Sequence, residues 1–325
     1  MHRVIITGGN GFIGRHLVKK LLSHKERPVV VISNTSNLND KYLAERKLLQ
    51  DMPLTFYTAD TRDRESILDI FLNESPDICI HLAAKTRVAD SIKNSDETMD
   101  INVKGTLNVL EACHYSQVNN FVFASSAAVY GDVRELPVSE NHKLEPLSPY
   151  GISKMLAEQH VASYNKSKKI QKTISLRIFD VYGDGQPSEA DVITRFAARP
   201  SKGLSPVIYG DGLQTRDFIS VDDVVEGILL SIRAMEEVEN NNSSSPLVFN
   251  IGTGKLTSIN ELVQKMIEIF GIDLQPIYEG GKDVGRDIKH SYADITLSKE
   301  ILHFVAKKEI ETGLRELIGP MLIGQ

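Results

Sequence analysis

The sequence predicts an α/β protein whose core is a doubly wound parallel β-sheet. Short β-rich runs alternate with segments of helical periodicity from Arg3 to Phe179. One run, Val29–Ile32, is wholly apolar, as in a strand that helices cover on both faces. A glycine-rich turn, Gly8–Gly14, joins the first strand to the first helix. Alternation of this kind gives parallel strands with right-handed crossovers, so we expect a Rossmann-type sheet.

The expected elements of this part follow in chain order. The expected strands are Arg3–Thr7, Pro28–Ser33, Leu54–Ala59, Asp77–Ala83, Asn120–Ala124 and Thr173–Phe179. The expected helices are Arg15–Ser23, Arg64–Asn73, Asp100–Ser116 and Pro149–Lys166.

After Tyr182 the regular alternation ends. Gly183–Lys202 is rich in glycine, proline and charge, and Glu236–Pro246 is a polar, low-complexity loop. The later elements are a strand end and helix over Phe218–Ala234, a strand over Leu247–Ile251, a helix over Ser258–Phe270 and a short terminal α/β segment. We expect a smaller, C-terminally weighted lobe that is interleaved with the first. Residues 1–179 and 217–252 would form the Rossmann domain, and residues 180–216 and 253–325 the second lobe.

Composition restricts the class of protein. The 325 residues carry a net charge of −6, which argues against general nucleic-acid binding. No apolar run approaches the ~18 residues that span a membrane, and Met1–Arg3 leads into a strand without a signal peptide. Cys79 and Cys113 lie in apolar segments and are interpreted as buried, reduced thiols. We expect a cytoplasmic protein with neither a nucleic-acid nor a membrane partner.

The first turn has the spacing of a dinucleotide-binding loop. Gly8, Gly11 and Gly14 fit G-x-x-G-x-x-G, and Gly9, Gly11 and Gly14 fit G-x-G-x-x-G, with Phe12 and Ile13 between the last two glycines. The glycines allow a tight turn and close approach of a pyrophosphate, which then lies at the helix N-terminus. A purely structural turn is the weaker alternative, because this one follows a strand and opens a helix.

The second strand lacks the acid that usually binds the adenosine ribose. It ends at Ser33-Asn34, and either side chain could hydrogen-bond the ribose without repelling a 2′-phosphate. Arg15 and His16 could pair with such a phosphate, but no arginine immediately follows the strand. NAD is therefore favoured as the coenzyme, and NADP stays open.

The third strand ends at Asp60-Thr61, which is placed to bind the adenine. A helix N-cap is an equally good interpretation of Asp60.

Tyr150 and Lys154 are spaced to share one face of a helix. A phenol with a pKa near 10 is a poor base at neutral pH, but a nearby ammonium favours the phenolate and lowers that pKa. Such a pair can take the proton of a sugar hydroxyl while a nicotinamide takes the hydride. Tyr-x-x-x-Lys alone is a weak signal, since surface helices often carry it. Ser126, upstream, supplies a further hydroxyl.

Taken together, the motifs resemble those of the extended short-chain dehydrogenase/reductases, in particular the NAD-dependent nucleotide-sugar epimerase/dehydratase family and its UDP-glucose 4-epimerase-like members. The resemblance covers nearly the whole length. It rests on Thr7–Gly14, His81–Ala84, Asn102–Thr106, Ser125–Gly131, Tyr150–Lys154, Leu176–Gly183, Tyr209–Gly212, Thr215–Phe218, Val221–Val224, Asn250–Gly254 and Arg286–Asp294, which occur together and in order.

The resemblance implies roles for individual residues. Tyr150 would be the base, Lys154 its electrostatic partner and a ligand of the nicotinamide ribose, and Ser126 the hydroxyl that bonds the reacting sugar oxygen. Asn102 would support the lysine from behind, and Leu82, Ala83 and Ala84 would line the coenzyme site. The residues implied on the substrate side are Lys85, Arg87, Ser126, Asp180, Arg216 and Arg286. Arg216 and Arg286 would clamp the nucleotide diphosphate. A homodimer built from helices of the Rossmann domain is also implied.

Two departures from the family pattern affect the predicted chemistry. Ala127 and Ala128 replace the Asp-Glu pair with which sugar 4,6-dehydratases remove water, so dehydration is not expected. Asp180 stands where many relatives have an asparagine near the diphosphate, and a carboxylate there would repel phosphate unless it is paired or turned away.

The predicted function is that of a UDP-sugar 4-epimerase of the UDP-glucose/UDP-galactose type, which works through a transient 4-keto sugar and tightly held NAD without a metal. Alternatives are a UDP-glucuronate or UDP-N-acetylhexosamine 4-epimerase, a net NAD(P)-dependent nucleotide-sugar oxidoreductase, and a catalytically silent binding protein. Arg87 is either a solvated loop arginine or the partner of a hexuronate carboxylate.

Overall fold

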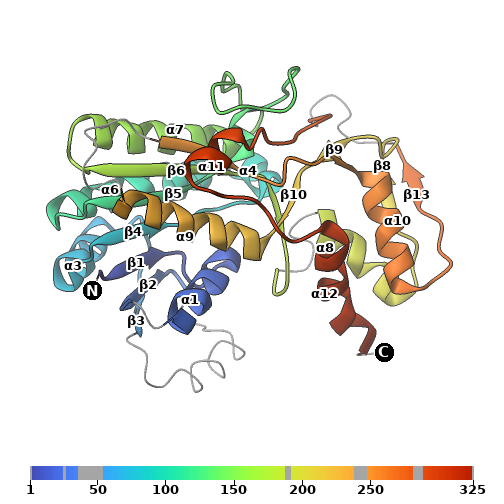
Figure 1. Cartoon of the computed structure of the whole chain (residues 1–325), viewed down its shortest axis with the longest axis horizontal. Helices are drawn as coiled ribbons and strands as arrows, with labels where there is room; N and C mark the ends of the chain where they lie inside the picture. The colour runs from blue at the N-terminus through green and yellow to red at the C-terminus, as the bar shows by residue number, and fades with distance from the viewer. Residues whose placement is uncertain are drawn as a thin grey trace.

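The computed structural model describes residues 2–24, 27–35, 54–186, 192–237, 247–280 and 288–323. A large lobe holds the central sheet and its flanking helices, and a smaller lobe of short strands and helices lies to one side (Figure 1). The Rossmann-type fold is confirmed. None of the helices in these ranges is long and apolar enough to cross a membrane.

The central sheet has seven parallel strands in the order β11-β6-β5-β4-β1-β2-β3. Its strands are β1 (Val4–Thr7), β2 (Val29–Ser33), β3 (Leu54–Thr58), β4 (Ile78–His81), β5 (Asn120–Ser126), β6 (Lys172–Ile178) and β11 (Leu247–Ile251). The strand order reverses between β1 and β4, and ligands of such sheets bind in the crevice at the carboxyl ends of the strands there.

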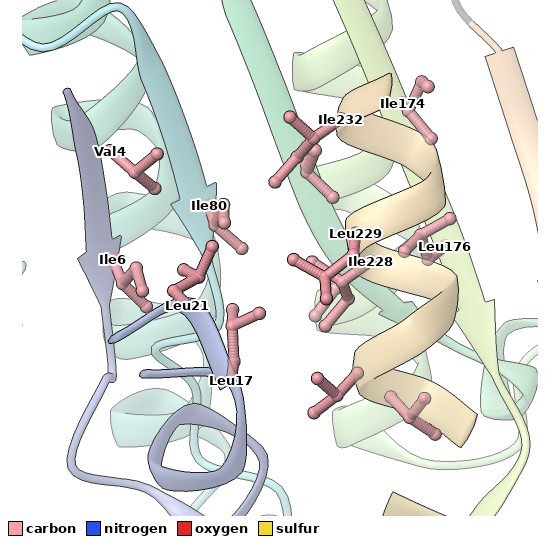
Figure 2. Packing of buried hydrophobic residues seen from close by; sticks show 14 of the residues in the cluster. Val4, Ile6, Leu17, Leu21, Ile80, Ile174, Leu176, Ile228, Leu229 and Ile232 are labelled. Carbon is pink, nitrogen blue, oxygen red and sulfur yellow. The ribbon is translucent and has the colours of Figure 1, made fainter. Parts of the chain in front are cut away.

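Helices cover both faces of this sheet. One face packs against α1 (Phe12–His24) and α9 (Val221–Glu237), whose apolar side chains meet those of β1, β4 and β6 (Figure 2). The other face packs against α3 (Arg64–Glu74), α6 (Gly105–Tyr115) and α7 (Pro149–Lys166). Burial of β1, β2 and β4 on both faces explains why every residue in these strands is buried.

The smaller lobe has its own apolar cluster. Its helices are α8 (Val192–Ala198), α10 (Ile259–Phe270) and α12 (Ile310–Ile323), with a 3₁₀ turn at Pro200–Lys202. Two pairs of short strands belong to this lobe, namely β8 (Val207–Tyr209) with β13 (Ile277–Glu279) and β9 (Thr215–Arg216) with β12 (Thr257–Ser258). A third pair, β7 (Asp180–Tyr182) with β10 (Phe218–Ser220), lies at the junction of the lobes.

The segment after α11 (Thr296–Ile301) returns to the large lobe. Leu302 and Phe304 pack in the cluster beneath the central sheet, although they fall in the range predicted for the second lobe. The division of the chain into the two predicted ranges stays a prediction.

The chain between β4 and α6 differs from the single predicted helix, Asp100–Ser116. Two short helices, α4 (Val88–Lys93) and α5 (Ser95–Met99), lead into a π-helical turn at Asp100–Lys104 before α6 begins. Gly105 explains the close packing at the start of α6, because a Cβ there would lie 2.5 Å from the Thr61 hydroxyl oxygen. π-Helical turns are common at functional sites, and this one contains Asn102.

Candidate active site

The glycine turn after β1 leaves no room for side chains. Gly8 has a φ of +71°, in the left-handed region, and a Cβ there would lie 2.7 Å from the Ala83 nitrogen. A Cβ on Gly14 would lie 2.3 Å from the Gly8 oxygen, so α1 begins directly against the turn. The Gly11 N–H donates to the Gly8 oxygen over 2.9 Å and closes the loop. The N-terminus of α1 therefore lies beside the ends of β1 and β4, an arrangement that suits a pyrophosphate.

A pocket of about 410 Å³ opens at this edge of the sheet. The predicted residues in its lining are Gly8, Gly11, Ser33, Asn34, Asp60, Thr61, Leu82, Ala83, Ala84 and Lys85. Further lining residues are Asn10, Ile32, Thr35, Ala59 and Ile101. Small residues, backbone amides and hydroxyls dominate, and they fit a dinucleotide that approaches the backbone closely. Lys85, predicted on the substrate side, lies in this lining.

Three predicted coenzyme residues of α1 lie outside that lining. Phe12 packs edge-on against the His16 ring, with centroids 5.7 Å apart, and Ile13 packs against the core beneath the sheet. Together with Gly14 they fix the position of α1, and a direct contact with the coenzyme stays a prediction.

The end of β2 carries neutral hydrogen-bonding groups. The Ser33 and Thr35 hydroxyl oxygens lie 3.3 Å apart, and the Asn10 amide donates to the Thr35 hydroxyl over 3.0 Å. Groups of this kind can bind ribose hydroxyls.

The two basic residues proposed for a 2′-phosphate are engaged elsewhere. The Arg15 guanidinium donates to the Gly185 carbonyl, and the His16 Nε2 lies 2.9 Å from the Asp184 carbonyl oxygen. Both side chains therefore bridge α1 to the loop that follows β7. This placement contradicts the suggested phosphate role and removes one argument for NADP.

Asp60 is bound by an arginine two residues along. The Arg62 Nε lies 3.1 Å from both Asp60 carboxylate oxygens, and these hydrogen bonds hold the pKa of Asp60 below its usual value. Asp63, and not Asp60, caps α3 by accepting from the Ser66 N–H. The N-cap alternative for Asp60 is therefore wrong, and its adenine role stays a prediction.

Tyr150 is presented by the first turn of α7. The Ser148 hydroxyl caps the helix by accepting from the Gly151 N–H over 3.1 Å. A Cβ on Gly151 would lie 2.5 Å from the Ala128 oxygen, so glycine lets α7 approach the turn after β5. This approach brings the side chains of Tyr150 and Ser126 close enough for Ser126 to lower the pKa of the phenol. The Ser126 hydroxyl also accepts from the Ala128 N–H over 3.2 Å.

Burial raises the pKa of the Tyr150 phenol. The neighbouring Ser126 hydroxyl lowers this pKa and opposes the effect of burial, and the Asp180 carboxylate raises it further. A site with these groups alone keeps Tyr150 protonated, so a base role requires additional stabilisation of the phenolate.

Lys154 lies one turn further along α7 and is buried. Its ammonium donates to the Ala124 carbonyl over 2.7 Å and lies 5.0 Å from the centroid of the Phe123 ring. Burial lowers the pKa of Lys154 to about 7, whereas both contacts favour the charged form. We expected Lys154 to lower the pKa of Tyr150. In the structure the ammonium is turned toward β5, and burial is the main influence on the pKa of the phenol.

Asn102 supports the neighbouring backbone. Its Nδ2 donates to the Lys85 carbonyl over 3.0 Å and to the Ser153 hydroxyl over 2.8 Å, and Ser153 donates to the Tyr150 carbonyl over 2.7 Å. Its Oδ1 accepts from the Lys85 N–H over 2.7 Å. Asn102 thus joins the loop after β4 to the turn that holds Tyr150 and Ser153, and its support of Lys154 stays a prediction.

His81 is a buried neutral residue below the site. Its Nε2 lies 2.9 Å from the Thr106 hydroxyl oxygen, which itself donates to the Asn102 carbonyl over 2.6 Å. The proton of the ring therefore lies on Nε2, and Nδ1 accepts from the Thr7 hydroxyl over 2.6 Å. Burial and the charge of Lys154 lower the pKa of His81 to about 3. Sequence reasoning gave this residue no role.

A buried ion pair lies one turn beyond Lys154. Glu158 accepts from Arg177 Nη2 over 2.6 Å and from Arg177 Nε over 3.1 Å, and the Ser125 hydroxyl donates to it over 2.7 Å. The remaining Arg177 nitrogen, Nη1, donates to the Tyr130 hydroxyl over 3.0 Å. Tyr130 in turn donates to the Asn250 amide oxygen over 2.6 Å. This network ties α7 to β5, β6 and β11, and the sequence analysis missed it.

The predicted substrate residues are spread over several elements. The Lys85 ammonium pairs with Glu97, and Arg87 lies at the start of α4 with its Nε 3.6 Å from Asp90. Asp180 is exposed at the start of β7, and its N–H donates to the Asp217 carbonyl over 3.1 Å. Arg216 is half-buried on β9. Arg286 lies outside the described residues, and its role stays a prediction.

Comparison with known proteins identifies the family. The model of the NAD dependent epimerase/dehydratase family matches residues 4–252. The chain belongs to this family. It is 31% identical to the UDP-glucose 4-epimerase of Lactobacillus helveticus over 94% of this chain and 93% of that protein.

Solved structures agree with this assignment. The crystal structure of UDP-glucose 4-epimerase with UDP-glucose from Thermotoga maritima has a TM-score of 0.86 and 33% identity, and the match covers 98% of this chain and 97% of that one. The Thermus thermophilus UDP-glucose 4-epimerase in complex with NAD has a TM-score of 0.83 and 29% identity, with 98% of each chain covered. The family predicted from the motifs is confirmed, and so is NAD as its coenzyme. The roles of individual residues stay predictions.

Proposed function

We propose that the protein is a UDP-sugar 4-epimerase that interconverts UDP-glucose and UDP-galactose. The observation that carries this proposal is the placement of the buried Tyr150 side chain near Ser126, with Lys154 one helical turn away. A phenol, a hydroxyl and an ammonium in this arrangement can move a proton at a sugar oxygen. The relatives from Lactobacillus helveticus and Thermotoga maritima are UDP-glucose 4-epimerases, and the second holds UDP-glucose.

In the proposed cycle Tyr150 takes the proton of the sugar O4, and Ser126 hydrogen-bonds the same oxygen and orients it. The Gly8–Gly14 turn and the pocket beside it would hold NAD, which would supply the acceptor for the C4 hydride and the source of its return. Lys154 would supply the further stabilisation that the phenolate requires and would bond the nicotinamide ribose, for which its ammonium has to leave the Ala124 carbonyl. The 4-keto sugar turns within the site, so that the hydride returns to its opposite face. Tyr150 then gives the proton back to O4, and no coenzyme is consumed.

The remaining proposed roles concern binding of the UDP diphosphate and of the adenosine part of NAD. Arg216 and Arg286 would bind the UDP diphosphate, Asp60 and Thr61 the adenine, and Ser33 and Asn34 the adenosine ribose. Ala127 and Ala128 occupy the 3₁₀ turn after Ser126 and cannot move protons, so water loss by the 4,6-dehydratase route is not part of this activity.

We further propose a cytoplasmic homodimer. Family membership supports the dimer, and the free, buried thiols of Cys79 and Cys113 are in keeping with the compartment.

The test is direct assay of the purified protein with NAD and UDP-glucose. We expect UDP-galactose to form without net accumulation of reduced coenzyme. Tyr150→Phe should lose at least ~100-fold in kcat, as expected for loss of a general acid–base group. Tyr164→Phe, which removes a hydroxyl from the same helix, is the matched control and should retain activity. Stoichiometric reduced coenzyme would favour a net oxidoreductase, and near-native turnover by Tyr150→Phe would sink the mechanism.

A further inference from the structure

A serine of α4 holds the backbone of Tyr150. Tyr150 is the second residue of α7, so its N–H is one of those that a helix leaves without an intrahelical acceptor. The Ser91 hydroxyl accepts from this N–H over 3.1 Å and donates to the Val88 carbonyl over 2.7 Å. Ser91 is fully buried, although it lies 59 positions away in the sequence. These two hydrogen bonds fix the orientation of its hydroxyl and join α4 to the N-terminus of α7.

The carbonyl of Tyr150 is held from the same part of the chain. It accepts from the Ser153 hydroxyl over 2.7 Å, and this hydroxyl accepts from the Asn102 amide over 2.8 Å. Ser91 lies in α4 and Asn102 in the π-helical turn, and both segments belong to the connection between β4 and α6. One connection therefore fixes the N–H and the carbonyl of Tyr150 together, through side chains that are all buried.

This connection starts at the pocket beside the glycine turn. Ala84 and Lys85 line the pocket, and α4 begins at Val88, shortly after them. The helix α4 packs against α7. A displacement of the pocket edge is therefore passed to Ser91, and through its hydroxyl to the backbone of Tyr150.

We propose that Ser91 is a positioning residue, which sets the place of the Tyr150 phenol relative to the Ser126 hydroxyl and so controls the rate of proton transfer. The inference rests on the proposed function and adds a residue to it. Ser91 acts through the backbone of Tyr150 and not through the phenol. A displacement of about 1 Å at a reacting group can cost about 100-fold in rate, so loss of the Ser91 hydroxyl should lower kcat by about 10- to 100-fold.

The experiment compares Ser91→Ala and Ser231→Ala with the wild type. Ser231 is the matched control, because it is also fully buried and its hydroxyl also donates over 2.7 Å to a carbonyl of its own helix, that of Gly227 in α9. We expect kcat on UDP-glucose to fall about 10- to 100-fold in Ser91→Ala, while KM and the Kd of NAD change less than about twofold. Ser231→Ala should leave kcat, KM and Kd unchanged.

A second measurement observes Tyr150 without any substrate. In protein labelled with 3-fluorotyrosine, the ¹⁹F NMR signal of Tyr150 is assigned by its absence from Tyr150→Phe. Ser91→Ala should shift or broaden this signal, whereas Ser231→Ala should leave it in place. If the wild type does not epimerise UDP-glucose, the proposed function has failed, and this signal still decides the positioning role of Ser91.

Two results would overturn the proposal. One is a kcat of Ser91→Ala within about twofold of the wild type, and the other is a Tyr150 signal that Ser91→Ala leaves unmoved. If Ser91→Ala does not fold, Ser91→Cys takes its place, since a thiol has a similar size and is a weaker acceptor. It should change kcat and the signal in the same directions by smaller amounts, and a wild-type kcat and signal in Ser91→Cys would then count against the proposal.

Discussion

Two arginine–carboxylate pairs of similar geometry differ sharply in burial. Glu158 and Arg177, which join α7 to β6, have side chains that are 8% and 6% exposed. Arg64 and Glu111, which join α3 to α6 through two hydrogen bonds of 2.7 Å, have side chains that are 50% and 30% exposed. Water screens the exposed pair. Loss of one partner of the buried pair leaves the other charge buried, with neither a partner nor water to stabilise it. Similar hydrogen bonds therefore have different consequences for stability.

The largest effect is expected for Glu158→Ala. It leaves the Arg177 guanidinium buried without its carboxylate and the Ser125 hydroxyl without its acceptor. We expect the free energy of unfolding to fall by about 3–5 kcal/mol, measured by urea denaturation. Turnover should fall as well, since the pair holds α7 against β5.

The matched control is Glu111→Ala, which should cost less than about 1 kcal/mol. Glu158→Gln keeps an acceptor for Ser125 and should recover part of the loss. Equal losses for Glu158→Ala and Glu111→Ala would show that burial does not separate the two pairs.

Lys154 extends the contrast to a single buried charge, with an intermediate expected effect. An unfolded lysine keeps its proton up to a pKa near 10.4, whereas burial lowers the pKa of Lys154 to about 7 in the fold. Between these values the unfolded state binds more protons, so stability rises with pH. We expect the free energy of unfolding to rise by about 1–2 kcal/mol from about pH 7 to pH 9, relative to Lys154→Met.

Subtracting the Lys154→Met curve removes the titration of groups that both proteins share. Lys154→Met should also unfold at a higher temperature near pH 7, because it removes a buried charge, and should lose activity if Lys154 has its proposed role. Parallel pH curves for the two proteins would mean that the Ala124 carbonyl and the Phe123 ring keep Lys154 fully charged.

The same contrast explains what the sequence could predict. The Gly8–Gly14 turn and the Tyr150–Lys154 spacing are local patterns, and local geometry determines how they fold. Glu158, Arg177, Tyr130 and Asn250 form one network although they are far apart in the sequence, so no local window shows it. One clue was present, because Glu158 continues the four-residue spacing of Tyr150 and Lys154.

Burial and long-range contacts also explain why some predictions from the sequence differ from the structure. The direction of the Tyr150 pKa depends on how much water the packed fold excludes, which the residue types do not reveal. The side chains of Arg15 and His16 bind carbonyl groups of the loop after β7. The sequence alone does not reveal that this loop lies beside α1. The split of the predicted Asp100–Ser116 helix likewise depends on contacts of Asn102 with a distant loop.

The smallest effect is expected for Arg87→Ala. Arg87 is 54% exposed, and its Nε lies 3.6 Å from Asp90 on the same short helix, so the pair should contribute less than about 0.5 kcal/mol to stability. Activity on UDP-glucose should change less than about threefold. Ser91, further along α4, accepts from the Tyr150 N–H over 3.1 Å and holds the helix in place without the arginine. Activity on UDP-glucuronate should change by the same small factor. A loss of activity on UDP-glucuronate alone, equivalent to about 1.5–3 kcal/mol, would instead show that Arg87 binds a substrate carboxylate. The interaction energy of this exposed charge would then be larger than its exposure to water implies.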